Sequence, residues 1–185
     1  MRLRILIAAV CATAALAGMS TIVLAQKAEP QTISATLENV NGVAVGKVSF
    51  TAASAKAPVA VRVSVRRLQA GFHGFHIHAV GKCEGPTFMS ATGHLKAMGQ
   101  NHGDHVGDMS SLLAKRNGTA SLRLTTDRFT LADLRDSDGS AVMVHANDDN
   151  FASIPPRYAP DGPDQSTLDT GDSGARVACG EIAPG

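Results

Sequence analysis

The chain has 185 residues, of which 44% are hydrophobic and 18% are charged, a balance typical of a globular domain. It has no tryptophan and one tyrosine, so a hydrophobic core must be built mainly from aliphatic side chains and six phenylalanines. The formal net charge of +1 excludes the strongly basic profile of a nucleic-acid-binding protein.

The N-terminal segment predicts an export signal. Two arginines precede an uncharged run over residues 5–25, and this run ends at the small residue Ala25. The run is also long enough for an uncleaved membrane anchor, but its polar interruptions favour cleavage near Ala25. We expect residues 1–25 to be a signal peptide, followed by a tail over 26–31. The mature chain would then have no integral membrane span and would be periplasmic, cell-envelope-bound or secreted.

Alternation of apolar and polar residues predicts β-strands through the rest of the chain. Residues 32–40 and 43–50 flank Asn41-Gly42, which is a hairpin signal. No amphipathic helix of useful length is visible, so the pattern predicts an all-β antiparallel sandwich or barrel. Further alternation is found at 59–66, 120–124 and 142–145, and the residues expected to separate strands are Gly118, Asp138-Gly139 and Gly180.

Two segments lack this alternation. Residues 82–108 are rich in glycine and histidine, and residues 147–174 are rich in aspartate, proline and glycine. Long segments of this kind in a compact domain are usually functional loops. We expect a bound metal and a disulfide to order them.

Two cysteines remain after a signal peptide is removed, because Cys11 lies within it. In an exported chain, Cys83 and Cys179 suggest one disulfide, and two buried free thiols are the alternative. A disulfide here would close a loop of about a hundred residues and stabilise the fold by about 4–5 kcal/mol in the chain-entropy model.

The stretch GFHGFHIH, residues 71–78, contains three of the seven histidines. In a regular strand, side chains alternate between faces, so His76 and His78 point the same way and His73 points to the other face. His145, in VMVHA, lies on another strand-like segment. His76, His78 and His145 are three possible metal ligands that need a fourth, and the histidine-rich loop can supply it.

That loop, over residues 94–108, contains three histidines and an aspartate at spacings that allow them to meet on one ion. Zinc takes four such ligands in a tetrahedron, and imidazole with carboxylate suits Zn(II) or Cu(II). A solvated polar loop without metal is the alternative, and the clustering argues against it. The expected set is His94, His102, His105 and Asp108.

The chain resembles the copper/zinc superoxide dismutases over residues 32–183. The motifs that carry the resemblance are GFHIH (74–78), HGDHVGD (102–108), VMVHANDD (142–149) and TGDSGARVACGEI (170–182), in this order. The resemblance implies that residues 32–185 form the family's eight-stranded antiparallel Greek-key β-sandwich or barrel, with two long functional loops. The stretch 150–163 is most similar to bacterial exported members, some of which bind copper alone.

The resemblance also implies site residues, with one copper and one zinc per chain. Asp149 would link a copper histidine to a zinc histidine, Arg176 would lie beside copper, and His73 would be structural. Cys83 and Cys179 would form the disulfide. The implied copper ligands are His76, His78, His94 and His145, and the implied zinc ligands are His94, His102, His105 and Asp108.

The implied activity is the conversion of superoxide to O₂ and H₂O₂ by alternation of Cu(II) and Cu(I). His94 would correspond to the family's bridging histidine. That histidine joins the two metals, releases copper when copper is reduced, and carries a proton to the product. Arg176 would offer a permanent positive charge to the superoxide anion. The alternatives are a non-enzymatic copper-binding or copper-delivering domain and a structural zinc protein. A homodimer is compatible with the sequence.

Three departures from the family pattern stand out. Only Gly103-Asp104 separates two zinc histidines, where many relatives have a longer insert, and Leu95-Lys96 follows His94 in place of a more usual Asn-Pro type of sequence. Asp169 stands where many relatives have a lysine. Lys82 or Lys96 would have to offset that acid if the anion is attracted to the site.

Overall fold

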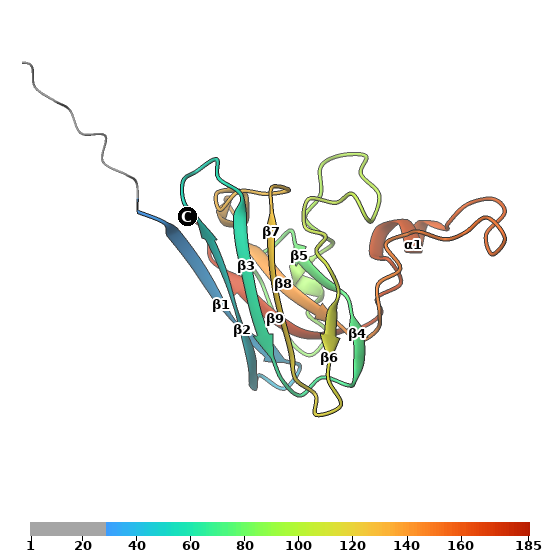
Figure 1. Cartoon of the computed structure of the whole chain (residues 1–185), viewed down its shortest axis with the longest axis horizontal. Coiled ribbons are helices and arrows are strands. Elements are labelled where there is room, and N and C mark those ends of the chain that lie inside the picture. The colour runs from blue at the N-terminus through green and yellow to red at the C-terminus, as the bar shows by residue number, and fades with distance from the viewer. Residues whose placement is uncertain (1–28) are drawn as a thin grey trace, which may run out of the picture.

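The structure is a computed structural model that describes residues 29–185 (Figure 1). The predicted signal peptide, residues 1–25, and residues 26–28 of the predicted tail lie outside the described residues. The first strand begins at Gln31, one residue before the start expected from the alternation.

Nine antiparallel strands form the framework of the described chain, residues 29–185. A seven-stranded sheet has the order β5-β8-β9-β1-β2-β3-β7, and β4 pairs with β6 in a second, two-stranded sheet. The strands are β1 (Gln31–Asn39), β2 (Ala44–Ala52), β3 (Val59–Val65), β4 (Gly71–His73), β5 (Phe75–His78), β6 (Leu112–Ala114), β7 (Ala120–Thr126), β8 (Ser140–His145) and β9 (Arg176–Ile182).

Strands β4 and β5 are two halves of one chain segment, separated only by Gly74. β5 pairs with β8 at one edge of the large sheet, and β4 pairs with β6, which lies beside β7 at the other edge. The segment therefore connects both edges and curls the sheet into a barrel. If β4 and β5 are counted as one strand, the barrel has eight strands. The predicted all-β barrel is confirmed.

The core follows the predicted alternation. Val59, Val61, Val63 and Val65 on β3 are all buried, while Arg62 between them is exposed. Burying each of these valines contributes about 1.5–3 kcal/mol. The interior of the barrel is thus a conventional apolar core.

Two details of the strand and helix prediction were wrong. Gly180 lies inside β9 and does not end a strand; a Cβ at this position would lie 2.8 Å from the Thr36 carbonyl oxygen, so glycine permits close approach of the neighbouring strand. A short helix, α1 (Gln165–Thr170), was not predicted. Asp164 caps its N-terminus by accepting a hydrogen bond from the Thr167 N–H, and Gly171 ends it in the left-handed conformation.

Two long loops, over residues 79–111 and 146–175, project from the side of the barrel formed by β4 and β5 (Figure 1). The 3-10 turns Met89–Ala91 and Asp133–Arg135 and helix α1 are the helical elements of the described chain. None of the helices over residues 29–185 is long and apolar enough to cross a membrane.

Candidate metal centre

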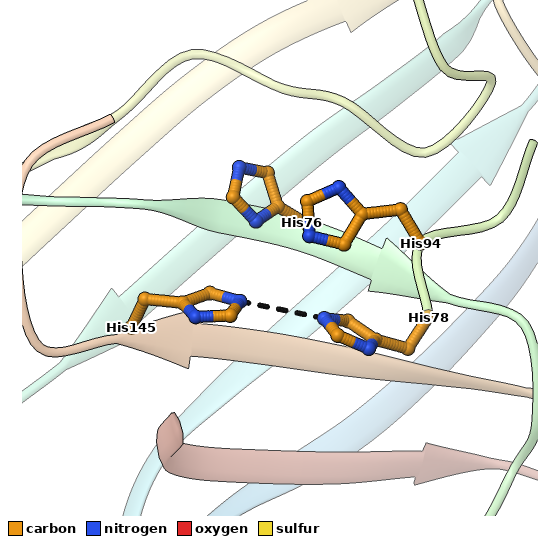
Figure 2. A group of neighbouring side chains, drawn as sticks. All are labelled: His76, His78, His94 and His145. Carbon is orange, nitrogen blue, oxygen red and sulfur yellow. Dashed lines mark hydrogen bonds between the residues drawn. The ribbon is translucent and has the colours of Figure 1, made fainter. Parts of the chain in front are cut away.

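Four buried histidines from three parts of the chain meet at one end of β5 (Figure 2). His76 and His78 lie on β5, His145 ends the neighbouring strand β8, and His94 comes from the first long loop. The pairing of β5 with β8 and a single bridge between His78 and His94 hold the segments together. One nitrogen from each of the four rings lies within 4.8 Å of the others, so the group can hold one metal ion.

Each histidine on a strand has one ring nitrogen engaged outside this group. His78 Nδ1 lies 2.8 Å from the Thr92 carbonyl oxygen, His145 Nδ1 lies 3.0 Å from the Gly174 carbonyl oxygen, and His76 Nε2 lies 2.7 Å from Asp149 Oδ2. These acceptors take the ring N–H and leave the other nitrogen with a free lone pair.

The remaining nitrogens face one another. His78 Nε2 and His145 Nε2 lie 3.3 Å apart, and His76 Nδ1 is buried without a hydrogen-bond partner (Figure 2). Buried polar atoms are rarely left unpaired unless a ligand completes them. The residues present therefore fit a metal ion bound by imidazoles.

Burial keeps these rings neutral. Desolvation lowers the pKa of His76 to about 4 and that of His145 to about 3, and it lowers the pKa of His78 well below its usual value. Only neutral imidazole can donate a lone pair to a metal. His76, His78 and His145 are therefore in their ligand form throughout the physiological pH range.

A second set of ligand atoms lies on the other side of His94. Its Nδ1 lies 3.3 Å from His105 Nδ1 and 3.1 Å from Asp108 Oδ1, and the same carboxylate oxygen lies 3.2 Å from His102 Nδ1. His105 Nδ1 is 3.5 Å from it. A zinc–nitrogen distance of about 2.0–2.1 Å places tetrahedral ligands about 3.3 Å apart. The three histidines and Asp108 therefore fit zinc.

The short Gly103-Asp104 connection is compatible with this set. Asp108 Oδ2 accepts hydrogen bonds from the backbone N–H groups of Gly103, at 2.7 Å, and His105, at 3.1 Å. Gly103 has a φ of +93°, and a Cβ there would lie 2.8 Å from the Phe151 carbonyl oxygen. Glycine is thus required both by the backbone angle and by the space.

Arg128, which follows β7, holds the same turn from the barrel side. Its Nη1 donates to the His105 carbonyl oxygen at 3.0 Å, and its Nη2 donates to the Gly103 carbonyl oxygen at 2.9 Å. The next residue, Phe129, is buried in the core against Phe50. The guanidinium therefore connects the zinc turn to a fixed part of the fold.

Asp149 lies between the two sets. Its two carboxylate oxygens each lie 2.7 Å from a histidine, Oδ2 from His76 Nε2 and Oδ1 from His102 Nε2. Burial raises the pKa of Asp149, but the hydrogen bonds of both histidines outweigh burial and hold it well below its usual value. Burial also lowers the pKa of His102, but its bonds to Asp108 and Asp149 raise it to about 9.

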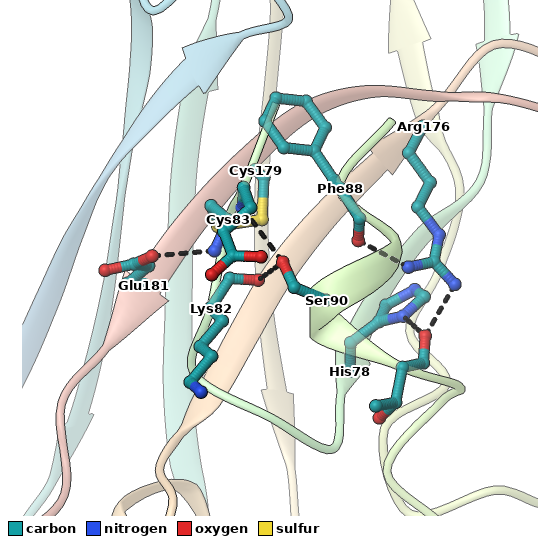
Figure 3. The surroundings of a disulfide bond; sticks show 10 residues. His78, Lys82, Cys83, Phe88, Ser90, Arg176, Cys179 and Glu181 are labelled. Carbon is teal, nitrogen blue, oxygen red and sulfur yellow. Dashed lines mark hydrogen bonds between the residues drawn. A yellow bond between two sulfur atoms is a disulfide. The ribbon is translucent and has the colours of Figure 1, made fainter. Parts of the chain in front are cut away.

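Arg176, at the start of β9, lines the hollow that leads to the four-histidine group. Its Nη1 donates to the Phe88 carbonyl oxygen at 2.6 Å, and its Nη2 donates to the Thr92 carbonyl oxygen at 2.5 Å, the same oxygen that engages His78 (Figure 3). The hollow has a volume of about 690 Å³. Arg176 is therefore a fixed positive charge at its edge.

The predicted disulfide between Cys83 and Cys179 is confirmed, with the Cα atoms 5.7 Å apart (Figure 3). It ties the start of the first long loop to β9, three residues beyond Arg176. The Cys83 N–H also donates to Glu181 Oε1 at 2.6 Å. The loop that carries the Phe88 and Thr92 carbonyl groups is thus fixed to the strand that carries Arg176.

Asp169, which lines the hollow, forms an ion pair with a lysine. Lys96 Nζ lies 3.0 Å from Asp169 Oδ1, and both residues line the hollow with Arg176. Lys96 is thus the lysine, of the two candidates, that lies beside Asp169. The pair is about 40% exposed, so its own contribution to stability is small.

His73 takes no part in either set. Its Nδ1 lies 2.7 Å from the His145 carbonyl oxygen and its Nε2 lies 2.9 Å from the Gln69 carbonyl oxygen, so both nitrogens are engaged. The alternation argument separated His73 from His76 and His78, although Gly74 interrupts the strand that it assumed. His73 joins the backbone of β8 to the segment before β4.

Sequence reasoning missed three groups that support the site. Two are the backbone carbonyl groups of Thr92 and Gly174, which no side-chain pattern reveals. The third is Arg128, which looks in the sequence like an ordinary surface arginine. Its position next to a phenylalanine at the end of a strand is the one signal that it is anchored.

A histidine-rich double metal site on an antiparallel barrel, with a disulfide next to an arginine, defines a class of two-metal β-barrel proteins. The family model described as copper/zinc superoxide dismutase (SODC) matches residues 44–182. The chain belongs to this family, and copper and zinc are its metals.

Individual relatives support the same family assignment. The chain is 43% identical over 171 residues to the superoxide dismutase [Cu-Zn] of Mycobacterium tuberculosis, covering 84% of this chain and 71% of that protein. It is 40% identical over 177 residues to the protein of that name from Mycolicibacterium paratuberculosis, covering 87% and 78%. A SOD-like protein from Bacillus subtilis has a similar structure, with a TM-score of 0.66 and 27% identity over 80% of this chain and 97% of that chain.

Proposed function

We propose that the protein is an exported superoxide dismutase, which converts superoxide to O₂ and H₂O₂. The observation that carries the proposal is His94, whose ring lies between a four-histidine group and a three-histidine, one-carboxylate group. The relatives named superoxide dismutase support the activity. The disulfide supports export, because disulfides persist mainly in oxidising compartments.

The positions of the ligand atoms in each set indicate which metal each residue would bind. His76 lies close to both sets, since its ligand atom is also within 4.8 Å of those of His94, His102 and Asp108. We place it with copper because His105 Nδ1 already completes the zinc set around Asp108. Copper would be held by His76, His78, His94 and His145, and zinc would be held by His94, His102, His105 and Asp108.

Bound copper supplies one-electron redox chemistry, and bound zinc supplies fixed positive charge. The chain supplies the proton path and the anion site. His94 presents Nδ1 to the zinc set and Nε2 to the copper set. Its Nε2 would then be the atom that holds a proton for the product. Asp149 keeps His76 and His102 in fixed orientations by accepting their N–H groups.

Arg176 attracts and orients the substrate. Both of its terminal nitrogens donate to backbone carbonyl oxygens, which fixes the guanidinium at the edge of the hollow while its charge stays unpaired by any acid of the described chain. A small anion entering the hollow would meet this charge before it reached the histidines. A copper-delivering domain on the same fold has no need of this arrangement, and no comparison supports that alternative.

The test is to reconstitute the protein with copper and zinc, then measure metal content and dismutation. We expect one copper and one zinc per chain, and turnover. For Arg176→Ala we expect both metals to be retained and turnover to fall by about 10–100-fold, since an interaction with a charged donor is worth about 1.5–3 kcal/mol.

Arg157→Ala is the matched control, because Arg157 is an exposed arginine outside the hollow. Copper binding without turnover in the unmodified protein would contradict the proposed function. Unchanged turnover in Arg176→Ala would remove that residue from the mechanism. The mass of the reconstituted protein in solution tests whether it is a homodimer.

A further inference from the structure

One face of the barrel, away from the metal centre, carries a group of exposed positive side chains on β2, β3, β7 and the adjoining turns. We call this group the basic face. Its members are Lys47, Arg62, Arg66, Arg67, Lys115, Arg116 and Arg123.

The strand register makes the basic face continuous. Arg62 on β3 lies directly opposite Arg123 on β7, and Lys47 on β2 lies opposite Ser64, two residues further along β3. Lys47 and Arg66 line one shallow hollow. The Leu68 N–H donates to the Gly118 carbonyl oxygen, which brings Arg67 beside the turn that contains Lys115 and Arg116.

The charge of this face is segregated from the rest of the chain. No aspartate or glutamate occurs between residues 39 and 83 or between 109 and 126. The described chain has 14 lysines and arginines (17 less Arg2, Arg4 and Lys27) and 16 acids, a net charge of 14 − 16 = −2. Half of the lysines and arginines of the described chain, whose net charge is slightly negative, therefore lie on one face.

The fold itself does not explain these cations. None of the seven takes part in an ion pair within residues 29–185. Like charges directly opposite each other on neighbouring strands, such as Arg62 and Arg123, destabilise a sheet. A feature that opposes stability and forms no ion pair within the described chain points to a partner outside it.

We propose that the basic face docks the protein on a lipid bilayer that contains anionic headgroups. The cations extend across three strands and a turn, so they cover a broad surface and do not line a groove for a linear polymer. Arg66 Nη2 donates to the Ala44 carbonyl oxygen, which places it beside the β1–β2 hairpin. Two valines at the tip of that hairpin, Val40 and Val43, are each 39% exposed and can enter the headgroup region.

Docking in this way leaves the metal centre accessible. The hollow with Arg176 is lined by residues of α1, and Figure 1 shows α1 and its loops projecting from the side opposite β2 and β3. The proposal assumes the export proposed above, but it does not depend on dismutase activity. Vesicle binding and turnover can therefore fail separately.

The experiment measures sedimentation of the metal-loaded protein with vesicles of phosphatidylcholine alone and of phosphatidylcholine with 30% phosphatidylglycerol. Every variant is prepared with the N-terminal segment in the same state. We expect binding to the anionic vesicles at low salt, loss of binding by about 0.5 M NaCl, and a fall of at least about tenfold in affinity for Arg62→Gln/Arg123→Gln.

The matched control, Arg135→Gln/Arg157→Gln, removes the same charge elsewhere and should bind within about twofold of the unmodified protein. Both variants should keep full turnover, and Arg62→Gln/Arg123→Gln should unfold at the same temperature as the unmodified protein or higher. Equal losses of vesicle binding in the two variants would overturn the proposal, as would a marked loss of stability in the first. Tighter binding to heparin than to anionic vesicles would replace the bilayer with a soluble polyanion.

Discussion

The copper and zinc sides of the centre are built in different ways. On the proposed assignment, the copper side takes His76, His78 and His145 from paired strands, so distant parts of the chain must fold before the ligands meet. On the same assignment, the zinc side takes all its ligands from residues 94–108, a single loop held by Asp149, Arg128 and helix α1. The copper ligands therefore inherit the rigidity of the barrel, whereas the zinc ligands depend on contacts that brace a loop.

The largest expected effect separates the two sides directly. His145→Ala removes a proposed copper ligand whose position is set by β8 and not by the loop. We expect copper loss and a fall in turnover of more than about 100-fold, since losing a ligand costs more than the 10–100-fold cost of losing an outer partner. Zinc content should stay near one per chain, as measured by elemental analysis.

His102→Ala is the reciprocal variant. It removes a proposed zinc ligand and leaves the strand histidines in place, so we expect zinc loss with most copper retained. Equal loss of both metals from each variant would show that the two sides are not separately built. Full zinc retention in His102→Ala would mean that His76, which lies near both sets, takes its place.

The same contrast explains what the sequence could predict. The strands, the hairpin at Asn41-Gly42 and the spacing of His76 and His78 follow from local alternation, which the fold respects. The order of four motifs was specific enough to indicate the family. The parts that escaped prediction are those that depend on backbone atoms or on distant packing, such as the Thr92 and Gly174 carbonyl groups.

Prediction from local sequence also failed where a residue type is compatible with two structural roles. Gly180 looked like a strand end because glycine is common in turns, yet it allows β9 to approach β1 closely. Helix α1 has only six residues, too few for a periodic pattern, although Asp164 and Gly171 are recognisable caps. Both cases needed the neighbouring elements to decide them.

In the metal-free protein, His76 and His145 should respond to pH in the opposite direction to His102. His76 and His145 have lowered pKa values, about 4 and about 3, so their contribution to stability is present above pH 6.5 and is lost as the pH falls. His102 has a raised pKa of about 9, so its contribution is present below pH 6.5 and is lost as the pH rises through 9.

Denaturant unfolding of the metal-free protein measures both. We expect the free energy of unfolding to fall by about 4–5 kcal/mol between pH 6.5 and 4.5, since each of the two groups costs up to about 1.4 kcal/mol per pH unit. A smaller fall is expected between pH 6.5 and 9, and it should be absent in His102→Gln. A stability that rose on acidification would show that the strand histidines are not held neutral by burial.

Variants of Arg128 test whether zinc binding depends on the two hydrogen bonds from its guanidinium to the Gly103–His105 turn. Arg128→Ala removes both hydrogen bonds to the turn, so we expect zinc affinity to fall by about tenfold while copper content is unchanged. Arg128→Lys should recover only part of this, because an ammonium group lacks the fork that reaches two carbonyl oxygens. Competition with a coloured chelator measures the affinity, and the absorption spectrum of Co(II) placed in the zinc site reports its geometry.

Arg123→Ala is the control for Arg128, since Arg123 lies outside the metal centre and makes no hydrogen bond to either long loop. Equal zinc affinities for Arg128→Ala and the unmodified protein would mean that Asp108 and the turn amides suffice. A tenfold loss with an unchanged Co(II) spectrum would also contradict the brace, since it requires the ligand geometry to relax.

The smallest expected effect concerns the Lys96–Asp169 pair at the copper entrance. One unit charge about 10 Å from the path of a superoxide ion is worth about 0.4 kcal/mol in water, or about a factor of two in rate. Lys96→Gln leaves Asp169 unpaired and should slow turnover about twofold at low salt, while Asp169→Asn should raise it by a similar factor. The double variant should return close to the original rate, and all differences should vanish at high salt, because the pair acts only through screened charge. If Lys96→Gln slows turnover equally at low and high salt, Lys96 acts by contact with the site and not by charge.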